Sequence, residues 1–150
     1  MEMIEILFWA SSVYILPLWA MMWFLPHHAT TWKVMSNPYT SIAPLCLFYG
    51  LAVLPSLVDI LLLFSTQMPT PSVVIDLFDD DTIRLVGWLH FLALDTLAGQ
   101  LTWKRCVEHK ISIKVSLPVL FLCMMVAPLG YLIGLLVIPS TNKQDIQTTH

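Results

Sequence analysis

The feature that most constrains this chain is the scarcity of charge along four long apolar runs, at residues 6–25, 41–64, 83–103 and 115–138. Their only charged residues are Asp59, Arg84 and Asp95. A helix needs about 20 apolar residues to cross the roughly 30 Å hydrocarbon core of a bilayer. Backbone groups in lipid must bond internally, which favours helices. The runs predict an all-α, polytopic membrane protein with four transmembrane helices in one bundle, and residues 1–150 forming a single membrane domain.

The overall composition supports this class. Of the 150 residues, 57% are hydrophobic and 11% are charged, whereas soluble domains carry about 25% charged residues. A net charge of -3 offers no basic surface for tracking phosphates, so we expect membrane lipid and no nucleic acid among the partners. Three cysteines without a CxxC pair give neither a disulfide framework nor a zinc pattern.

The distribution of Lys and Arg predicts the orientation. The two connections that follow the first and third runs hold five basic residues, namely Lys33, Lys104, Arg105, Lys110 and Lys114. The other side has only Arg84 and Lys143. Because basic loops stay on the cytoplasmic side, we expect these two connections there (stromal in a plastid) and both termini opposite. The acidic start before residue 6 is typical of a retained span rather than a signal peptide.

Prolines interrupt the regular pattern in and between the runs. Pro17, Pro55 and Pro128 lie inside three runs, where each removes a hydrogen bond and frees a carbonyl one turn earlier. They are either ordinary prolines of membrane helices or bends that hold a cavity open. For the connection 65–82 we expect a solvated loop, with a short interfacial helix in its middle as the alternative, and we expect residues 140–150 to fray.

Asp95 stands out because it lies near the middle of the third run. A charged Asp there costs on the order of 3 kcal/mol, so it must be paired, protonated or lining a wet cavity. Its helix face repeats at spacings of three or four residues and comprises Arg84, Trp88, Phe91, Asp95, Gly99 and Thr102. On this face, Gly99 allows another helix or a ligand to approach closely.

His90 lies on a different face, about 140° from Asp95 at 100° per residue. The two can serve one site only if that site wraps around the helix; otherwise His90 bonds to a neighbouring helix. A haem with two histidine ligands would need a second His at similar depth, but the others lie in loops or the tail, at His27, His28, His109 and His150. No metal motif is present, so no cofactor is expected.

Counting depth along alternating spans gives a second group of polar side chains. Tyr14, Asp59, His90 and Tyr131 each lie about five to eight residues from the non-cytoplasmic end of their spans, which places them in one layer at about 1.5 Å per residue. Such a layer suits the polar head of an amphipathic ligand. The two tyrosines could instead be interfacial anchors.

Three stretches resemble a known family. The segment Gly87-Trp88-Leu89-His90-Phe91-Leu92-Ala93-Leu94-Asp95, followed by Gly99, is similar to the signature of the abscisic-acid-deficient-four family, also called neoxanthin-synthase-like. Residues 16–26 resemble its first span, and residues 128–132 its last. One departure is that Gln100 and Leu101 stand where many members have Arg and Trp, so a substrate or lipid contact of that arginine would be changed.

The resemblance implies a carotenoid-linked protein of a plastid or thylakoid membrane, or of a bacterial inner membrane. In plants the family is implicated in forming neoxanthin from violaxanthin, an isomerisation that moves no net electrons and needs only acid–base groups. Asp95 would act as acid and His90 as base, or the reverse. The candidates for contacting the carotenoid are Trp88, Asp59, Tyr14, Tyr131 and Gly99. The alternative is a non-catalytic subunit that binds pigment or assembles a photosynthetic pigment–protein complex.

Overall fold

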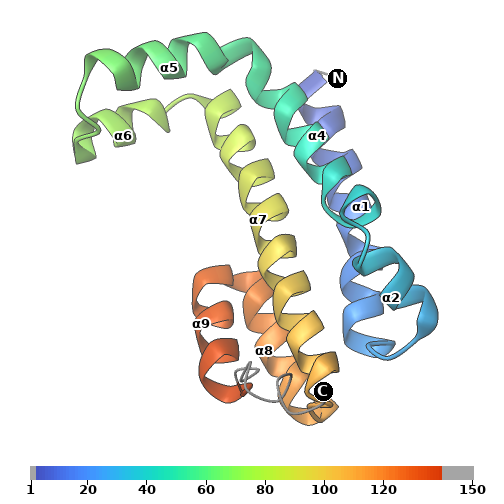
Figure 1. Cartoon of the computed structure of the whole chain (residues 1–150). Helices are drawn as coiled ribbons and strands as arrows, with labels where there is room; N and C mark the ends of the chain where they lie inside the picture. The colour runs from blue at the N-terminus through green and yellow to red at the C-terminus, as the bar shows by residue number, and fades with distance from the viewer. Residues whose placement is uncertain (1–2, 140–150) are drawn as a thin grey trace, which may run out of the picture.

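The computed structural model describes residues 3–139, and all regular secondary structure in this range is helical. The predicted all-α class is therefore confirmed for these residues. In chain order the elements are α1 (Met3–Phe24), α2 (Ala29–Met35), α3 (Pro38–Ser41), α4 (Ala43–Val53), the 3-10 turn η1 (Leu54–Ser56), α5 (Leu57–Thr66), α6 (Pro71–Leu77), α7 (Asp81–Glu108), α8 (Ile113–Met125) and α9 (Ala127–Val137) (Figure 1).

The central element is α7, a helix of 28 residues that contacts α1, α4, α8 and α9. Its start is fixed by Asp80, whose carboxylate accepts a hydrogen bond from the N–H of Ile83 at 3.0 Å. Such a cap satisfies one of the unpaired N–H groups of a helix N-terminus. Arg84 adds an ion pair with Asp81 at 2.7 Å. The helix extends beyond the predicted run 83–103 at both ends.

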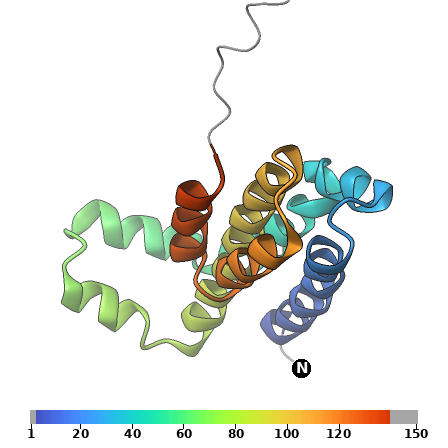
Figure 2. The same ribbon diagram turned by 90° about the horizontal axis from the view of Figure 1, so that it is seen from below.

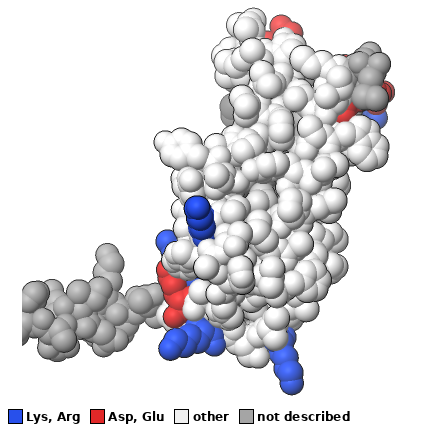
Figure 3. All heavy atoms as spheres, turned by 90° about the vertical axis from the view of Figure 1, so that its right-hand side faces the viewer, with Lys and Arg blue, Asp and Glu red and all other residues white. Residues whose placement is uncertain are grey.

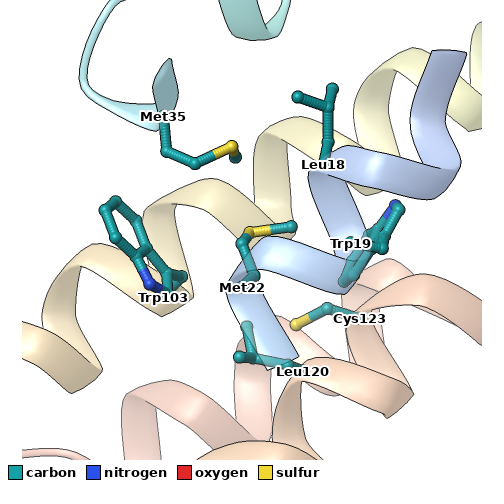
Figure 4. Close-up of a cluster of buried hydrophobic side chains, with 7 residues drawn as sticks. All are labelled: Leu18, Trp19, Met22, Met35, Trp103, Leu120 and Cys123. Atoms are coloured by element: carbon teal, nitrogen blue, oxygen red, sulfur yellow. The ribbon is translucent and has the colours of Figure 1, made fainter. Parts of the chain in front are cut away.

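Buried side chains join α7 to its neighbours in two clusters. Near its C-terminal end, α1, α2 and α8 meet it through Leu18, Trp19, Met22, Met35, Trp103, Leu120 and Cys123 (Figure 4). Within this cluster, the buried Trp103 donates its indole N–H to the carbonyl of Pro26 at 3.1 Å. Near the N-terminal end of α7, the starts of α1 and α7 pack with the end of α4 through Ile4, Leu7, Ala52, Val53, Val86 and Leu89.

The second predicted span, 41–64, is bent rather than straight. Pro55 lies in η1 and has no N–H for the carbonyl of Leu51, so the chain turns there. Beyond the turn, α5 leaves the other helices and runs back as α6, and together they project to one side (Figures 1 and 2). Neither α5 nor α6 has a buried residue. The expected solvated loop over 65–82 is wrong for residues 71–77, which form the alternative helix.

The prediction of a single span over 115–138 is wrong. The run forms two helices, α8 and α9, that fold back on each other at Val126, a non-helical residue with φ -146° and ψ 77°. Pro128 cannot donate to the carbonyl of Met124, so the helix breaks there. A Cβ on Gly130 would lie 2.2 Å from the backbone N of Cys123, and one on Gly134 would lie 3.4 Å from Val119. The two arms are therefore antiparallel and packed closely through glycines.

This fold-back also overturns the expected placement of both chain ends on one face. The carbonyl of Ile138 accepts a hydrogen bond from Arg105 at 3.0 Å, at the C-terminal end of α7. By contrast, Ile4 and Leu7 pack at its N-terminal end. The two ends of the described chain thus lie at opposite ends of α7. The expectation for residues 140–150 falls outside the described residues.

Two helical segments of the described chain are long and apolar enough to cross a membrane, in place of the four predicted. They are α1, which coincides with the first run, and Ala43–Thr66 taken through the bend at η1. Figure 3 shows a broad uncharged area on the face formed by α1, α2 and α4, with most of its Lys and Arg side chains toward the lower end.

Candidate functional site

A pocket of about 480 Å³ lies between α1, α7 and the turn that joins α8 to α9. Its walls are Ile15, Trp88, Phe91, Leu92, Asp95 and residues 124–128. We call it the Asp95 pocket, because Asp95 is the only ionisable side chain in that lining. Its volume falls within the roughly 300–1,000 Å³ of typical ligand sites, which are mostly apolar with a few polar groups. The geometry suits an oily molecule that presents one polar group to a carboxyl.

Asp95 is half-buried in this pocket. Among the described residues its carboxylate has no hydrogen bond and no ion pair, so it is available to a ligand. Opposite it, the break between α8 and α9 brings Met124 and Pro128 into the wall. Because Pro128 lacks an N–H, the carbonyl of Met124 is left without its helical donor. A carboxyl and a short non-helical stretch of backbone therefore line the same apolar cavity. Within a membrane, non-helical backbone is tolerated only where it is buried in protein or lines a cavity.

Only part of the predicted Asp95 face of α7 lines the pocket. Trp88 and Phe91 lie in its wall beside Asp95, as their spacing predicts. Further along, Gly99 packs against α1, since a Cβ there would lie 2.4 Å from the ring of Trp19. Thr102 is buried 3.5 Å from the sulfur of Cys123. Gly99 therefore serves helix contact in this structure and is not part of the pocket wall.

His90 is not brought to Asp95. It lies on another face of α7, where its ring stands edge-on to Tyr49 of α4 with centroids 5.1 Å apart. The side chain of His90 is exposed, and it is not among the residues of the Asp95 pocket. This separation agrees with the 140° between the two positions on an ideal helix. An acid–base pair of Asp95 and His90 would have to act across the helix.

The predicted polar layer is not assembled either. The Tyr14 hydroxyl donates to the carbonyl of Thr40 at 2.6 Å, and its ring meets Phe48. Asp59 lies on the bent-away α5, in an acidic hollow of about 460 Å³ shared with Asp76 and Asp80. Tyr131 is half-buried on α9, one residue beyond the contact of Gly130 with α8. The bends at Pro55 and Pro128 carry two of the four side chains away from the expected depth.

Two features of the structure were not predicted from the sequence, namely the hydrogen bonds of Gln100 and the pocket wall formed by residues 124–128. The side-chain amide of Gln100 donates to the carbonyl of Met35 and to the Ser41 hydroxyl, the latter at 3.1 Å. Gln100 thus ties α7 to the segment of α2 and α3. The other is the wall formed by residues 124–128. Its signal was the proline at 128 followed by small residues at 130 and 134, a spacing that permits close helix contact.

Metal binding finds no support among residues 3–139, where no group of three or more His, Cys, Asp or Glu side chains is arranged to hold an ion. A search of curated proteins and of solved structures finds no match. The sequence profile described as ABA DEFICIENT 4-like matches residues 6–133, which include the Asp95 pocket and every predicted site residue. The chain belongs to the ABA DEFICIENT 4-like family.

Proposed function

We propose that this protein is a multi-pass membrane isomerase that converts an epoxycarotenoid of the violaxanthin type into an allenic alcohol of the neoxanthin type. The observation that carries the proposal is the Asp95 pocket, an apolar cavity with one free carboxyl. The family, with its tie to abscisic acid formation, supports a carotenoid as the ligand. The pocket has room for one end group, while the polyene would extend along the apolar outer surface.

The reaction needs one proton delivered and one removed. Protonation of the epoxide oxygen opens the bond to the ring carbon beside the polyene, and positive charge passes into the polyene. Loss of a proton from the next polyene carbon then forms the allene, while the oxygen stays as a hydroxyl. Protons and electrons balance, so the substrate is rearranged without an oxidant or a reductant.

Asp95 can carry both transfers in turn. As the neutral acid it donates to the epoxide oxygen, and as the resulting carboxylate it removes the proton from carbon, which restores the acid. This cycle fits a pocket in which Asp95 is the only ionisable side chain. The rings of Trp88 and Phe91 in the same wall would stabilise the intermediate cation through their π faces.

The test is a conversion assay with the purified full-length protein in liposomes. We expect violaxanthin supplied without any cofactor to yield neoxanthin, detected by its absorption spectrum and retention time. Violaxanthin that binds and stays unconverted, together with co-purification of a pigment–protein complex, would contradict the enzyme and favour an assembly subunit. A matched incubation of empty liposomes measures spontaneous epoxide opening.

We further propose that α1, α7 and the segment Ala43–Thr66, which runs from α4 through η1 into α5, cross the membrane. The membrane is that of a plastid or thylakoid or a bacterial inner membrane. In this arrangement α8 and α9 form a hairpin that enters and leaves on one side. The arms have 13 and 11 residues, or about 20 and 17 Å at 1.5 Å per residue, short of the roughly 30 Å core.

This arrangement predicts that tags at the N-terminus and the C-terminus are exposed on opposite sides of the membrane. We expect added protease to remove only one of them from sealed vesicles of uniform orientation, and both after detergent. Four crossing helices would place both tags on one side, so simultaneous removal from sealed vesicles would refute the hairpin.

A further inference from the structure

Three cavities follow one another along the contact between α1 and α8, and the proposed reaction uses only the first of them. This first cavity is the Asp95 pocket, and the next two have volumes of about 590 and 450 Å³. Helix α8 lines them in order with Met125, then Phe121 and Leu117, then Ile113. Residues at a spacing of four form a ridge along a helix surface, so the three cavities share one side of α8. We call them together the α1–α8 groove.

Helix α1 and the connection that follows it supply the opposite wall. Ile15 lines the first cavity, Trp23 the second, and Phe24 both the second and the third. Between the first two cavities, Trp19 is only 2% exposed and packs its ring inward, against Gly99 of α7. The cavities follow each other along α1 in the reverse of their order along α8, because the two helices are antiparallel.

The groove is polar at both ends and apolar between them. The carboxyl of Asp95 stands at one end and His28 at the other. No polar atom of the described chain faces the second cavity, where the rings of Trp23 and Phe121 have centroids 6.2 Å apart, at an angle of 40°. Aromatic faces favour stacked contacts with other π systems. Such a wall therefore suits a flat, conjugated chain.

The far end of the groove offers a hydrogen-bond donor. The Nδ1 atom of His28 accepts a hydrogen bond from the N–H of Thr30 at 3.2 Å. The neutral ring then carries its proton on Nε2, from which it can be donated to an oxygen atom. From Met125 to Ile113, α8 advances by twelve residues, or about 18 Å, between the two ends. The groove thus fits a long, thin molecule with an oxygen at each end.

We propose that the α1–α8 groove binds the whole length of the substrate, a linear polyene with an oxygenated ring at each end. This inference rests on the proposed function and adds how the substrate is recognised. One epoxide ring reaches Asp95, and the polyene lies against the rings of Trp23 and Phe121. The hydroxyl of the second ring accepts a hydrogen bond from His28.

Two features favour this occupant over the acyl chain of a membrane lipid. A lipid with its head group near His28 would bring the methyl end of its chain to Asp95, and a carboxyl gains nothing from that contact. A saturated chain also lacks the π system on which Trp23 and Phe121 would stack. A substrate held at both ends presents one ring to Asp95 at a time, so each binding event converts one end only.

The test compares violaxanthin with a fragment that keeps one epoxide ring but ends after a short polyene, using the full-length protein in liposomes. Leu117→Trp fills the second cavity, because Leu117 lies in its wall and is 39% exposed. We expect this overpacked contact to raise the ratio of KM for violaxanthin to KM for the fragment about tenfold. Leu135→Trp on α9 is the matched control. Leu135 is 42% exposed and lines none of the three cavities, so the ratio should stay unchanged.

A second variant tests the far end of the groove. His28→Ser keeps a side-chain oxygen that can cap α2 but removes the ring donor. We expect it to raise the ratio of KM for violaxanthin to KM for an analogue without the second hydroxyl several-fold. An unchanged ratio would contradict the role of His28 and place the second ring elsewhere.

The outcomes separate the groove from the reaction. An unchanged ratio for Leu117→Trp, with conversion intact, would overturn the groove and leave the proposed reaction standing. No conversion of either substrate by wild type would refute the reaction instead. The groove is then tested by binding alone, from the absorption shift of violaxanthin added to the same variants. Binding that Leu117→Trp does not weaken would assign the groove to lipid.

Discussion

Replacing Asp95 with Asn is expected to lower the rate of epoxide isomerisation by about 10²–10⁴-fold. Asn keeps the size and shape of the side chain but can neither give nor take the proton that the reaction transfers. Because Asp95 is half-buried and without a hydrogen bond or ion pair among residues 3–139, the substitution removes neither kind of interaction from the folded protein. The measurement is initial conversion of violaxanthin by wild type and variant at equal amounts of inserted protein.

Asp76→Asn is the matched control, since it makes the same chemical change on the exposed α6, away from the Asp95 pocket, and should leave the rate near that of wild type. Near wild-type turnover by Asp95→Asn would mean that this carboxyl is structural. His90→Gln separates the two mechanisms. Retained activity supports Asp95 acting alone, whereas a loss comparable with that of Asp95→Asn supports the pair predicted from the sequence.

The second large effect concerns the contact between α8 and α9. Gly130→Ala would place a methyl carbon 2.2 Å from the backbone N of Cys123 and 2.5 Å from the carbonyl carbon of Leu122. Because these are backbone atoms, no side-chain rotation relieves the overlap, and the two helices must separate. Overpacking of this kind costs about 1–3 kcal/mol. We expect this loss in the free energy of unfolding, measured by denaturant titration of helicity in mixed micelles.

Gly50→Ala supplies the control, because nothing lies within 4 Å of a Cβ at that position on α4. There the change removes only the conformational freedom of glycine, so the helix should gain about 0.5–1 kcal/mol. Equal stabilities of the two variants would show that α8 and α9 are not packed through Gly130. Since that contact also shapes the wall of the Asp95 pocket, Gly130→Ala should weaken violaxanthin binding as well.

Hydropathy identified the helices that stand alone and misjudged those that depend on neighbours. The run 6–25 became α1 almost unchanged, because it has no breaker except Pro17 inside a continuous helix. The run 83–103 ended at the first Lys and Arg, yet α7 continues to Glu108. Both Lys and Arg are good helix formers. The first charged residues after an apolar run therefore end the apolar stretch but need not end the helix.

The sequence located the candidate carboxyl and its companions but not the full site. Asp95, Trp88 and Phe91 share the pocket because they lie on one rigid helix, where spacing alone fixes the face. Asp59 and Tyr131 were misplaced because depth counting assumes that every run crosses the membrane without bending. Whether a proline only kinks a helix or reverses it depends on the partner surface, here the backbone of Cys123 against Gly130.

The short arms of the α8–α9 hairpin have a consequence for how the protein is made. An arm of 11 or 13 residues cannot stop in a bilayer by itself, because its ends would leave unpaired backbone groups in hydrocarbon. In the proposed topology the hairpin would therefore enter as one unit, and only once α7 is present to receive it through Thr102 and Arg105. In this topology, insertion therefore follows a fixed order, and the Asp95 pocket is completed only after α7 is in place.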